Sequence, residues 1–378
     1  MDISKMDITK IYQSRRNKVY SFMKKNNLSA VVFCDSEDNR TPDVRYLCGH
    51  PSDALLVLTA EKKAYLFPWD INLAEKKAYA DEIKPSTEFN RSNIECLKYV
   101  LSKPGFANKD CVELPPSLSF LKYTEIKNEM KKFKFICSSD LTHSYVYSMR
   151  AVKDEYEIEC TRKACKVTDY MEQLIIKLLK QGKIKTEIDA ALLIEKELRL
   201  NGCERTSFDT LAAGPQRSFA IHAFPGFTKN EWGTQGLSIL DFGVCYEGYA
   251  SDCTITIANK PNKMQKKMLN LVETAASECL KLYKNGGKIL AASKCAEKIF
   301  AQSNMIMPHG LGHGTGLEIH EAPFVNLRAE KLTFKAGNIV TLEPGLYDRL
   351  YGGVRLENDV LITKDGNEVL TSSKIVRL

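Results

Sequence analysis

The stretch Leu240–Thr254, "LDFGVCYEGYASDCT", places two aspartates in one predicted β-hairpin. Apolar residues run through "LSILDFGVCY" and again through "YASDCTITIA", which is the pattern of two paired strands. Asp241 and Asp252 are symmetric about a turn centred between Tyr246 and Glu247, so the sequence predicts that they face one another across the ladder. Directly opposed residues have Cβ atoms about 5 Å apart on one face of the sheet, where two like charges are destabilising.

A second predicted hairpin has the same unfavourable pairing. The stretches "NIVTLEPGLY" and "GGVRLENDVLIT" form another strand pair, in which Glu343 and Glu357 are symmetric about Leu350. One pair of opposed carboxylates is explained by an accident of register. Two such pairs in otherwise apolar strands predict a bound cation.

The segment Met307–Pro323, "MPHGLGHGTGLEIHEAP", contains three of the six histidines of the chain. His309 and His313 are four residues apart, as in a helical zinc motif, but each intervening glycine would cost such a helix about 1 kcal/mol. The segment is therefore predicted to be a loop whose glycines let the backbone approach a crowded site. A single histidine here would be interpreted as a polar core residue, but four opposed carboxylates elsewhere favour a shared functional site.

Four carboxylates with one imidazole make a hard, oxygen-rich set of ligands. Such a set suits manganese or a similar divalent ion better than a structural zinc, which prefers cysteine and histidine. Four negative charges balance two divalent cations. Two metals about 3.5–4 Å apart can share a bridging water and lower its pKa until hydroxide forms near neutral pH. The residues alone therefore predict a hydrolase centre.

The other predicted elements indicate two domains in a chain of 378 residues. The first part is predicted to be α/β, with a helix ending at Asn26-Asn27 and strands at 29–34, 54–60 and 63–68. A boundary is predicted near "SMRAVKDE". Beyond it, amphipathic helices alternate with hairpins, which predicts an α+β domain with a mixed or antiparallel sheet.

Composition excludes several classes of protein. With 44% apolar and 27% charged residues and no long apolar run, the chain is predicted to be globular, with neither a membrane span nor a signal peptide. The net charge of +7 comes from lysine-rich stretches without interleaved aromatic residues, so no nucleic-acid partner is predicted. The twelve cysteines show no paired spacing, which predicts free thiols and a cytoplasmic protein.

Taken together, these residues resemble the pita-bread metallopeptidases, which include aminopeptidase P, prolidase and, more distantly, methionine aminopeptidase. "LDFGVCYEGYASDCT" resembles the segment with two metal aspartates, "PHGLGHGTGLEIHEAP" the metal-histidine segment, and "TLEPGLY" and "GVRLEND" the two glutamate segments. The resemblance implies a catalytic domain over 151–378, with a curved mixed or antiparallel sheet flanked by helices. Residues 1–150, through "VRYLCGHPSDALLVL", resemble the smaller α/β creatinase/prolidase-type domain, which methionine aminopeptidases usually lack.

The resemblance also implies the residues of the site. The expected ligands of two divalent ions, manganese with cobalt or zinc as alternatives, are Asp241, Asp252, His313, Glu343 and Glu357. Glu343 is also expected to act as general base and then general acid. His222, in "RSFAIHAFP", is expected to line the substrate cleft, His309 to bind substrate, and His320 to contact the scissile carbonyl.

The implied activity is that of a metal-dependent Xaa-Pro aminopeptidase, which hydrolyses the bond before proline with a metal-bridging hydroxide. A homodimer acting on proline-containing peptides is expected. The alternative is an Xaa-Pro dipeptidase, or prolidase. Some prolidases hold the substrate carboxylate with an arginine just after the "HEAP"-like segment, whereas here Phe324 follows and Arg328 is the nearest candidate. Ile255 also replaces an arginine found in many relatives.

Two further alternatives are a non-catalytic binding protein on the same fold and a creatinase-like enzyme. Binding proteins of this fold typically lack one or more of the ligands, and creatinase-like enzymes do not need this metal set. All five expected ligands are present in order in the sequence. A peptidase is therefore favoured over both.

Overall fold

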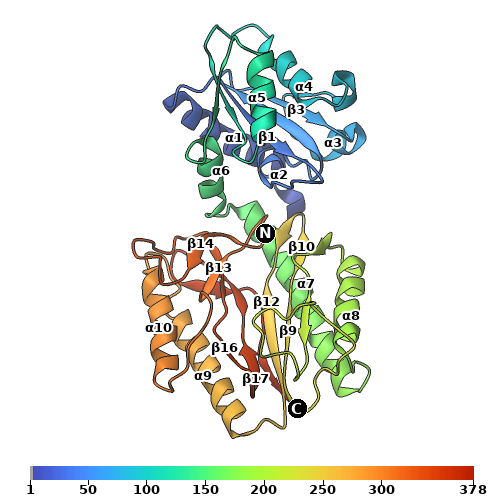
Figure 1. Cartoon of the computed structure of the whole chain (residues 1–378), viewed down its shortest axis with the longest axis vertical. Helices are drawn as coiled ribbons and strands as arrows, with labels where there is room; N and C mark the ends of the chain where they lie inside the picture. Colours follow the sequence, from blue (N-terminus) through green and yellow to red (C-terminus); the bar gives the residue numbers. More distant parts are fainter. Residues whose placement is uncertain (1–2) are drawn as a thin grey trace. The chain divides into compact units, whose positions relative to one another are not determined.

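The computed structural model describes residues 3–378, which divide into two compact units (Figure 1). One unit is Ser4–Met149, and the other contains Arg150–Leu378. The division falls inside the segment "SMRAVKDE". Within the described residues, no helix combines the length and the apolar character that crossing a membrane requires.

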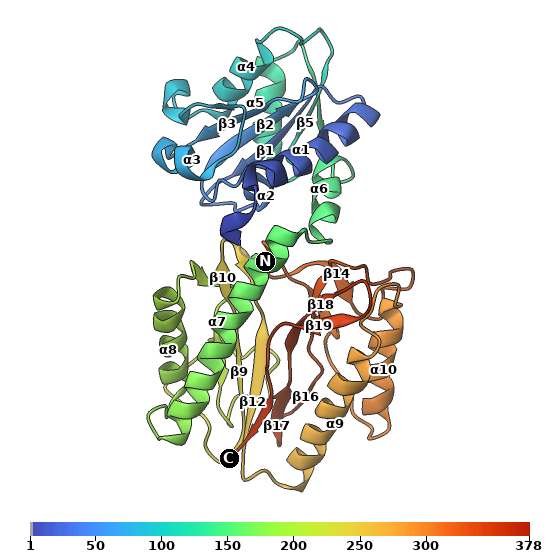
Figure 2. The same cartoon turned by 180° about the vertical axis from the view of Figure 1, so that it is seen from behind.

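The first unit is built on a six-stranded sheet in the order β4-β3-β2-β1-β5-β6. Its strands are β1 (Ala30–Asp35), β2 (Ala54–Thr59), β3 (Ala64–Pro68), β4 (Glu82–Ile83), β5 (Cys111–Leu114) and β6 (Lys134–Cys137). Its α-helices are α1 (Ile8–Lys25), α2 (Asp43–Cys48), α3 (Ile71–Lys77), α4 (Asn93–Leu101), α5 (Phe120–Glu129) and α6 (Thr142–Arg150). Strand β2 is buried along its whole length because α4 and α5 cover one face of the sheet and α1 and α2 the other (Figures 1 and 2). The predicted helix end and the three predicted strands are confirmed.

The second unit combines four long helices with several short sheets. The helices are α7 (Glu155–Lys180), α8 (Glu187–Leu200), α9 (Lys263–Leu280) and α10 (Ile289–Ala301). The strands are β7 (Arg205–Thr206), β8 (Leu211–Ala213), β9 (Gly236–Phe242), β10 (Val244–Tyr246), β11 (Tyr249–Ala250), β12 (Cys253–Asn259), β13 (Gly312–Gly314), β14 (Glu321–Val325), β15 (Ile339–Leu342), β16 (Gly345–Asp348), β17 (Gly352–Arg355), β18 (Asn358–Ile362), β19 (Asn367–Val369) and β20 (Ile375–Arg377). Most pairings are antiparallel, whereas β12 and β20 are parallel, so the sheets are mixed as predicted.

Two apolar cores hold this unit together. One core packs α7 and α8 against β9 and β12, in the sheet β20-β12-β9-β8. The other packs α9 and α10 against β15 and β18, in the sheet β14-β13-β15-β18-β19. The two helix pairs lie on opposite sides of the strands (Figure 1). The strand faces that point away from the helices are therefore free to carry polar side chains.

The prediction that Asp241 and Asp252 lie directly opposite one another is wrong, because Asp241 pairs with Thr254. The hairpin turns at Glu247-Gly248, whose φ values of 46° and 83° are those of a two-residue turn that favours glycine. This turn lies one residue later than predicted, so the register shifts by two residues and Asp252 stays on the same face as Thr254. The two aspartates are diagonal neighbours on one face.

The register predicted for the second hairpin is correct. Strands β16 and β17 pair symmetrically about Leu350, with Gly345 opposite Arg355. Strands β15 and β18 continue the same register, with Leu342 opposite Asn358. Glu343 and Glu357 lie between these two pairings.

Candidate metal centre

All five side chains predicted as metal ligands line one cavity of about 470 Å³. Asp241 lies in β9, Asp252 directly precedes β12, and His313 lies in β13. Glu343 directly follows β15, and Glu357 directly precedes β18. Residues from four distant stretches of sequence are therefore brought together by the ends of the central strands.

Strand alternation explains why these carboxylates point into the cavity. Leu240 and Phe242 belong to the apolar core under α7 and α8, so Asp241 between them points to the opposite face. Alternate residues of β15 and β18 likewise join the core under α9 and α10. Glu343 and Glu357 continue the polar face of those two strands.

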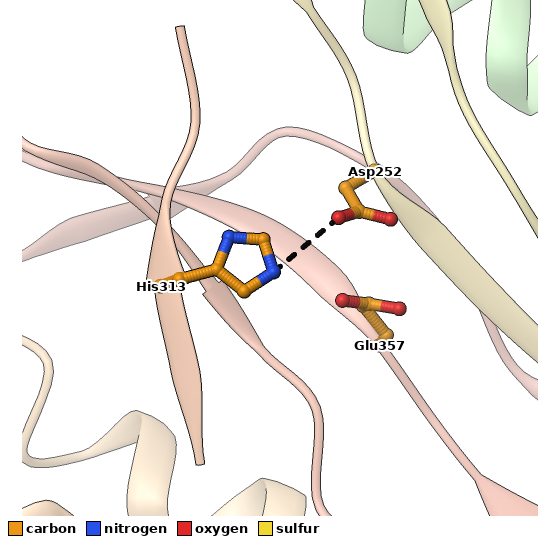
Figure 3. Close-up of side chains that lie close together, drawn as sticks. All are labelled: Asp252, His313 and Glu357. Atoms are coloured by element: carbon orange, nitrogen blue, oxygen red, sulfur yellow. Dashed lines mark ion pairs between the residues drawn. The ribbon is translucent and has the colours of Figure 1, made fainter. Parts of the chain in front are cut away.

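A compact group in the cavity is formed by the buried side chains of Asp252, His313 and Glu357 (Figure 3). One ligand atom from each lies within 4.8 Å of the others, and His313 Nε2 is 3.6 Å from Asp252 Oδ2. Ligand atoms placed about 2.1 Å from one ion are separated by roughly 3–4 Å. Thr254 Oγ1 donates a 2.6 Å hydrogen bond to Oε2 of Glu357 and so orients this carboxylate. The spacing of the group fits a metal ion.

The carboxylates of the cavity are poorly compensated by the protein. Asp241 Oδ1 and Asp252 Oδ1 are buried without a hydrogen-bond partner among the described residues. Burial, followed by the charges of Glu357 and Asp241, raises the pKa of Asp252 well above its usual range. Burial also raises the pKa of Glu343 to about 7, although the nearby Arg355 opposes this shift. Such groups are costly unless a cation compensates them, and the oxygen-rich set therefore fits a divalent ion.

His313 is prepared to act as a neutral ligand. Burial, together with the nearby His320, lowers the pKa of His313 to about 3, which keeps the imidazole uncharged. His313 Nδ1 faces the carbonyl oxygen of Gly314 at 3.2 Å, while Nε2 is directed towards Asp252 and, at 3.5 Å, Oε1 of Glu343. A ligating histidine typically has its second ring nitrogen bonded to such an oxygen.

The other three predicted histidines line the same cavity. The ring centroids of His320 and His313 are 4.2 Å apart, and burial lowers the pKa of His320. His309 Nε2 is 3.1 Å from the hydroxyl of Tyr347, and burial lowers the pKa of His309 to about 4. His222 enters from the segment between β8 and β9.

The glycines of the histidine segment are required by close packing. A Cβ atom on Gly312 would lie 2.1 Å from the carbonyl oxygen of Thr341, and one on Gly314 would lie 2.4 Å from that of Ala322. The exclusion of a helix is correct, but the prediction of a continuous loop is not. Gly312–Gly314 form the strand β13, because this backbone pairs with both β14 and β15.

Arg355 is a buried residue of the site that the sequence reasoning missed. Its Nη2 lies 2.5 Å from Oδ2 of Asp241, its Nε donates to Thr254 Oγ1 at 2.9 Å, and its Nη1 donates to the Tyr347 hydroxyl at 2.6 Å. Strand alternation could have found it, because residues two apart share a face and Arg355 precedes Glu357 by two positions. Arg355 fixes Asp241 and connects it to the histidine-bearing side of the cavity.

A second cavity of about 480 Å³ continues from the same centre. It shares His309, His313, His320 and Glu343 with the first cavity. Its other lining residues include the polar and charged side chains of Glu297, Asn326 and Arg328. Two cavities therefore adjoin the residues of the proposed metal centre.

Comparison with known proteins identifies the family. The model of "Metallopeptidase family M24" matches residues 159–364. This chain belongs to metallopeptidase family M24. It is 28% identical over 372 residues to the Xaa-Pro dipeptidase of Pyrococcus horikoshii, covering 96% of this chain and 98% of that protein. It is 32% identical over 261 residues to the Xaa-Pro dipeptidase of Pyrococcus furiosus, covering 68% of this chain and 72% of that protein.

Solved structures of M24 relatives show the same fold. The prolidase of Pyrococcus horikoshii is similar with a TM-score of 0.79 and 28% identity, covering 96% of this chain and 99% of that chain. The X-Pro aminopeptidase of Thermotoga maritima is similar with a TM-score of 0.82 and 25% identity, covering 96% of this chain and 100% of that chain. The predicted pita-bread fold and the predicted metallopeptidase family are confirmed.

Proposed function

We propose that this M24 metallopeptidase is an exopeptidase that hydrolyses the bond between a first residue and a following proline. The observation that carries the proposal is a single cavity whose lining includes the four carboxylates and four histidines predicted from the sequence. The names of the dipeptidase and prolidase relatives support the choice of substrate. Proline needs a dedicated enzyme, because its nitrogen carries no hydrogen for a cleft to bind and its ring restricts φ.

The proposed cofactor is a pair of divalent ions, with manganese expected and cobalt or zinc as alternatives. Asp241, Asp252, His313, Glu343 and Glu357 would hold them, in agreement with the unpartnered oxygens of the two aspartates. When bound, such ions supply Lewis acidity towards water and the scissile carbonyl. Four carboxylates balance the charge of two divalent ions, which is the argument for a pair.

We assign roles in catalysis and substrate binding to four residues of the chain. A carboxylate oxygen of Glu343 takes a proton from the attacking water and later gives it to the leaving proline nitrogen. His320 donates a hydrogen bond to the carbonyl oxygen as that oxygen gains negative charge. His222 positions the peptide near the leaving nitrogen, and His309 contributes a further substrate contact. All four side chains line the same cavity.

We propose dipeptides as the favoured substrates, which makes the protein an Xaa-Pro dipeptidase. Arg328 lines the second cavity, which continues from Glu343 and His320, so its guanidinium is available to a C-terminal carboxylate. The first residue of the peptide would occupy the first cavity, next to the carboxylates that hold the ions. The Xaa-Pro aminopeptidase remains the second candidate, favoured by Phe324, which is 43% exposed where some prolidases have an arginine.

The proposal also covers the domain organisation, the oligomeric state and the cellular location of the protein. Residues 1–150 would be the creatinase/prolidase-type domain and 151–378 the catalytic domain, supported by the division between Met149 and Arg150. A homodimer is proposed. A cytoplasmic location is supported by the twelve cysteines, which are free thiols. No nucleic-acid partner is proposed.

Metal analysis combined with a peptide panel tests the proposal. The purified protein should contain two divalent ions per chain and hydrolyse an Xaa-Pro dipeptide faster than the matching Xaa-Pro-Xaa tripeptide. A preference for the tripeptide would establish the aminopeptidase instead. Substituting Arg328→Met should raise the KM of the dipeptide and leave that of the tripeptide amide unchanged. Failure to cleave any Xaa-Pro peptide with both ions bound would refute the proposed function.

A further inference from the structure

A buried carboxylate outside the metal centre holds one segment of the active site. Glu187, the first residue of α8, is 0% exposed. Its Oε1 accepts a hydrogen bond from the backbone N–H of Gly214 at 2.7 Å. Its Oε2 accepts from the N–H and hydroxyl of Thr228, at 2.7 and 2.6 Å, and from Nη1 of Arg217 at 2.9 Å. One carboxylate therefore binds both ends and the early part of the segment 214–228.

The segment 214–228 has no helix or strand and carries residues that face the substrate cavity. His222 and Phe224 both line that cavity, and Phe224 is 97% exposed. The second guanidinium nitrogen of Arg217 donates to the carbonyl oxygen of Pro225, which follows Phe224 directly. Two backbone hydrogen bonds reach its C-terminal end, from Ala212 to Gly226 at 2.8 Å and from Ile188 to Thr228 at 3.1 Å. Because no continuous ladder fixes the rest of this backbone, side-chain hydrogen bonds contribute to its position.

The opposite side of the segment contacts β17, next to the metal centre. Ser218 Oγ accepts a hydrogen bond from the N–H of Gly353 at 3.1 Å. Arg355 Nη1 donates to the carbonyl oxygen of Ile221 at 3.2 Å. The residues around His222 are thus held between Glu187 on one side and Arg355 on the other.

Helix capping does not explain the presence of Glu187. Helix α8 already has a complete capping box, in which the side chains of Thr186 and Asp189 bond each other's backbone N–H groups. A carboxylate in the first turn interacts favourably with the helix dipole even when it is exposed to solvent, so this interaction does not require burial. Complete burial instead directs Glu187 away from solvent and onto the segment 214–228.

We propose that Glu187 is a positioning residue for substrate binding. Through Arg217 and Thr228 it fixes the segment 214–228 so that His222 and Phe224 face the bound peptide. The inference rests on the proposed function, because it takes the first cavity as the place where an Xaa-Pro peptide binds. Charge-assisted hydrogen bonds such as that from Arg217 are stronger than neutral ones, so they suit a clamp on an irregular backbone.

The direct test is Glu187→Gln, which keeps the shape of the side chain and removes its charge. The five proposed metal ligands lie outside the segment, so the metal content per chain should be unchanged. The loosened segment should raise KM and lower kcat/KM for an Xaa-Pro dipeptide by about 10–100-fold. Amide hydrogen exchange across residues 214–228 should become faster in the substrate-free holoenzyme.

The matched control is Asp189→Asn, on the same turn of α8. Asp189 is exposed, and its hydrogen bonds with Lys185 and Thr186 serve the helix cap. This variant should lower the melting temperature and leave both KM and the exchange of 214–228 unchanged. Arg217→Lys provides a milder second variant, because it keeps a cation beside Glu187 but loses the bond to Pro225. It should show the same changes as Glu187→Gln, reduced in size.

The outcomes separate this inference from the proposed function. The positioning of the segment 214–228 by Glu187, Arg217 and Thr228 is called the clamp below. The clamp is refuted if wild-type protein cleaves Xaa-Pro peptides and Glu187→Gln has the same KM and the same hydrogen exchange as the Asp189→Asn control. Loss of metal in Glu187→Gln or Arg217→Lys would also overturn it, because Glu187 would then support the ligands. If wild-type protein cleaves no such peptide, the proposed function fails, while faster exchange of 214–228 in both clamp variants still supports the clamp.

Discussion

Two groups of buried carboxylates in the larger unit have opposite surroundings. Glu187 and Glu321, which are 0% and 1% exposed, are bonded to cations. Asp252 and Glu357, at 4% and 2%, are as deeply buried but lie among other carboxylates. Arg355 Nε is 4.0 Å from Oε2 of Glu357, but its charge does not offset the burial and the like charges that raise the pKa of Glu357. Burial alone therefore does not distinguish a structural carboxylate from a functional one. The charges that surround it do.

The effect of these surroundings is clearest at Glu321. Although burial raises the pKa of this residue, Lys153 and Arg150 outweigh it and hold the pKa below its usual value. Lys153 Nζ is 2.7 Å from Oε1 of Glu321, and Arg150 Nη2 is 2.9 Å from Oε2. The protein thus compensates this charge itself. At Asp252 the compensation must come from outside the chain, which is what a cation site requires.

Removing the cation should produce the largest effect, because it leaves the second group of carboxylates uncompensated. Prolonged chelation with EDTA should abolish peptide hydrolysis and lower the melting temperature, and manganese or cobalt should restore both. Activity, melting temperature and metal content are measured on the same sample. Full activity with no bound metal would contradict the proposed metal centre.

Two histidine variants test which side chains belong to the metal centre. His313→Ala should lose metal and activity together. His320→Ala should keep the metal and lose about 10²–10³-fold in turnover, which corresponds to one missing oxyanion donor. Metal content, melting temperature and turnover are measured for both. An unstable but catalytically normal His320→Ala would show that this residue serves packing.

Removing one charge from each group should change the free energy of unfolding in opposite directions. Lys153→Met leaves Glu321 partly uncompensated and should lower the free energy of unfolding by about 3 kcal/mol. In metal-free protein, Asp252→Asn removes a like charge from the cavity and should raise that free energy by about 1 kcal/mol. Denaturant unfolding of metal-free samples at pH 8 measures both changes. Destabilisation by both variants would show that the second group is also structural.

Glu172 belongs to neither group, and its expected effect is smaller than that of Lys153→Met. It is 1% exposed, its oxygens have no hydrogen-bond partner among the described residues, and Lys374 Nζ is 3.8 Å from Oε1. Burial raises the pKa of Glu172 from 4.5 to about 8. A carboxyl group with a raised folded-state pKa contributes stability below its unfolded pKa and loses it as the pH rises through the folded one.

Wild-type protein should therefore lose roughly 1–2 kcal/mol of unfolding free energy from this residue between pH 4.5 and 8. Glu172→Gln should lack this loss and show a flatter stability profile over the same range. Urea unfolding at several pH values, with metal kept constant, gives both profiles. Identical slopes for the two proteins would mean that Glu172 is ionised throughout.

Local patterns were sufficient to predict much of the fold and of the candidate site. The capping box of Thr186 and Asp189 is an example of a local pattern, because its bonds span only three residues. The strand partner of Asp241 depends on the position of one turn. That turn lies one residue later than predicted, because Glu247 and Gly248 form it.

The sequence by itself indicated the four carboxylates that share the cavity, because strand alternation acts over a few residues, but it did not indicate Arg355. It did not reveal which of the buried acids are compensated. Glu187 meets Arg217 and Thr228 across 30 and 41 residues, and Glu321 meets Lys153 across 168. Only the tertiary structure decided these partnerships, because charge compensation depends on distances between segments that no local pattern encodes. The same physics left Asp241 and Asp252 each with an unpartnered oxygen, where a cation would complete the site.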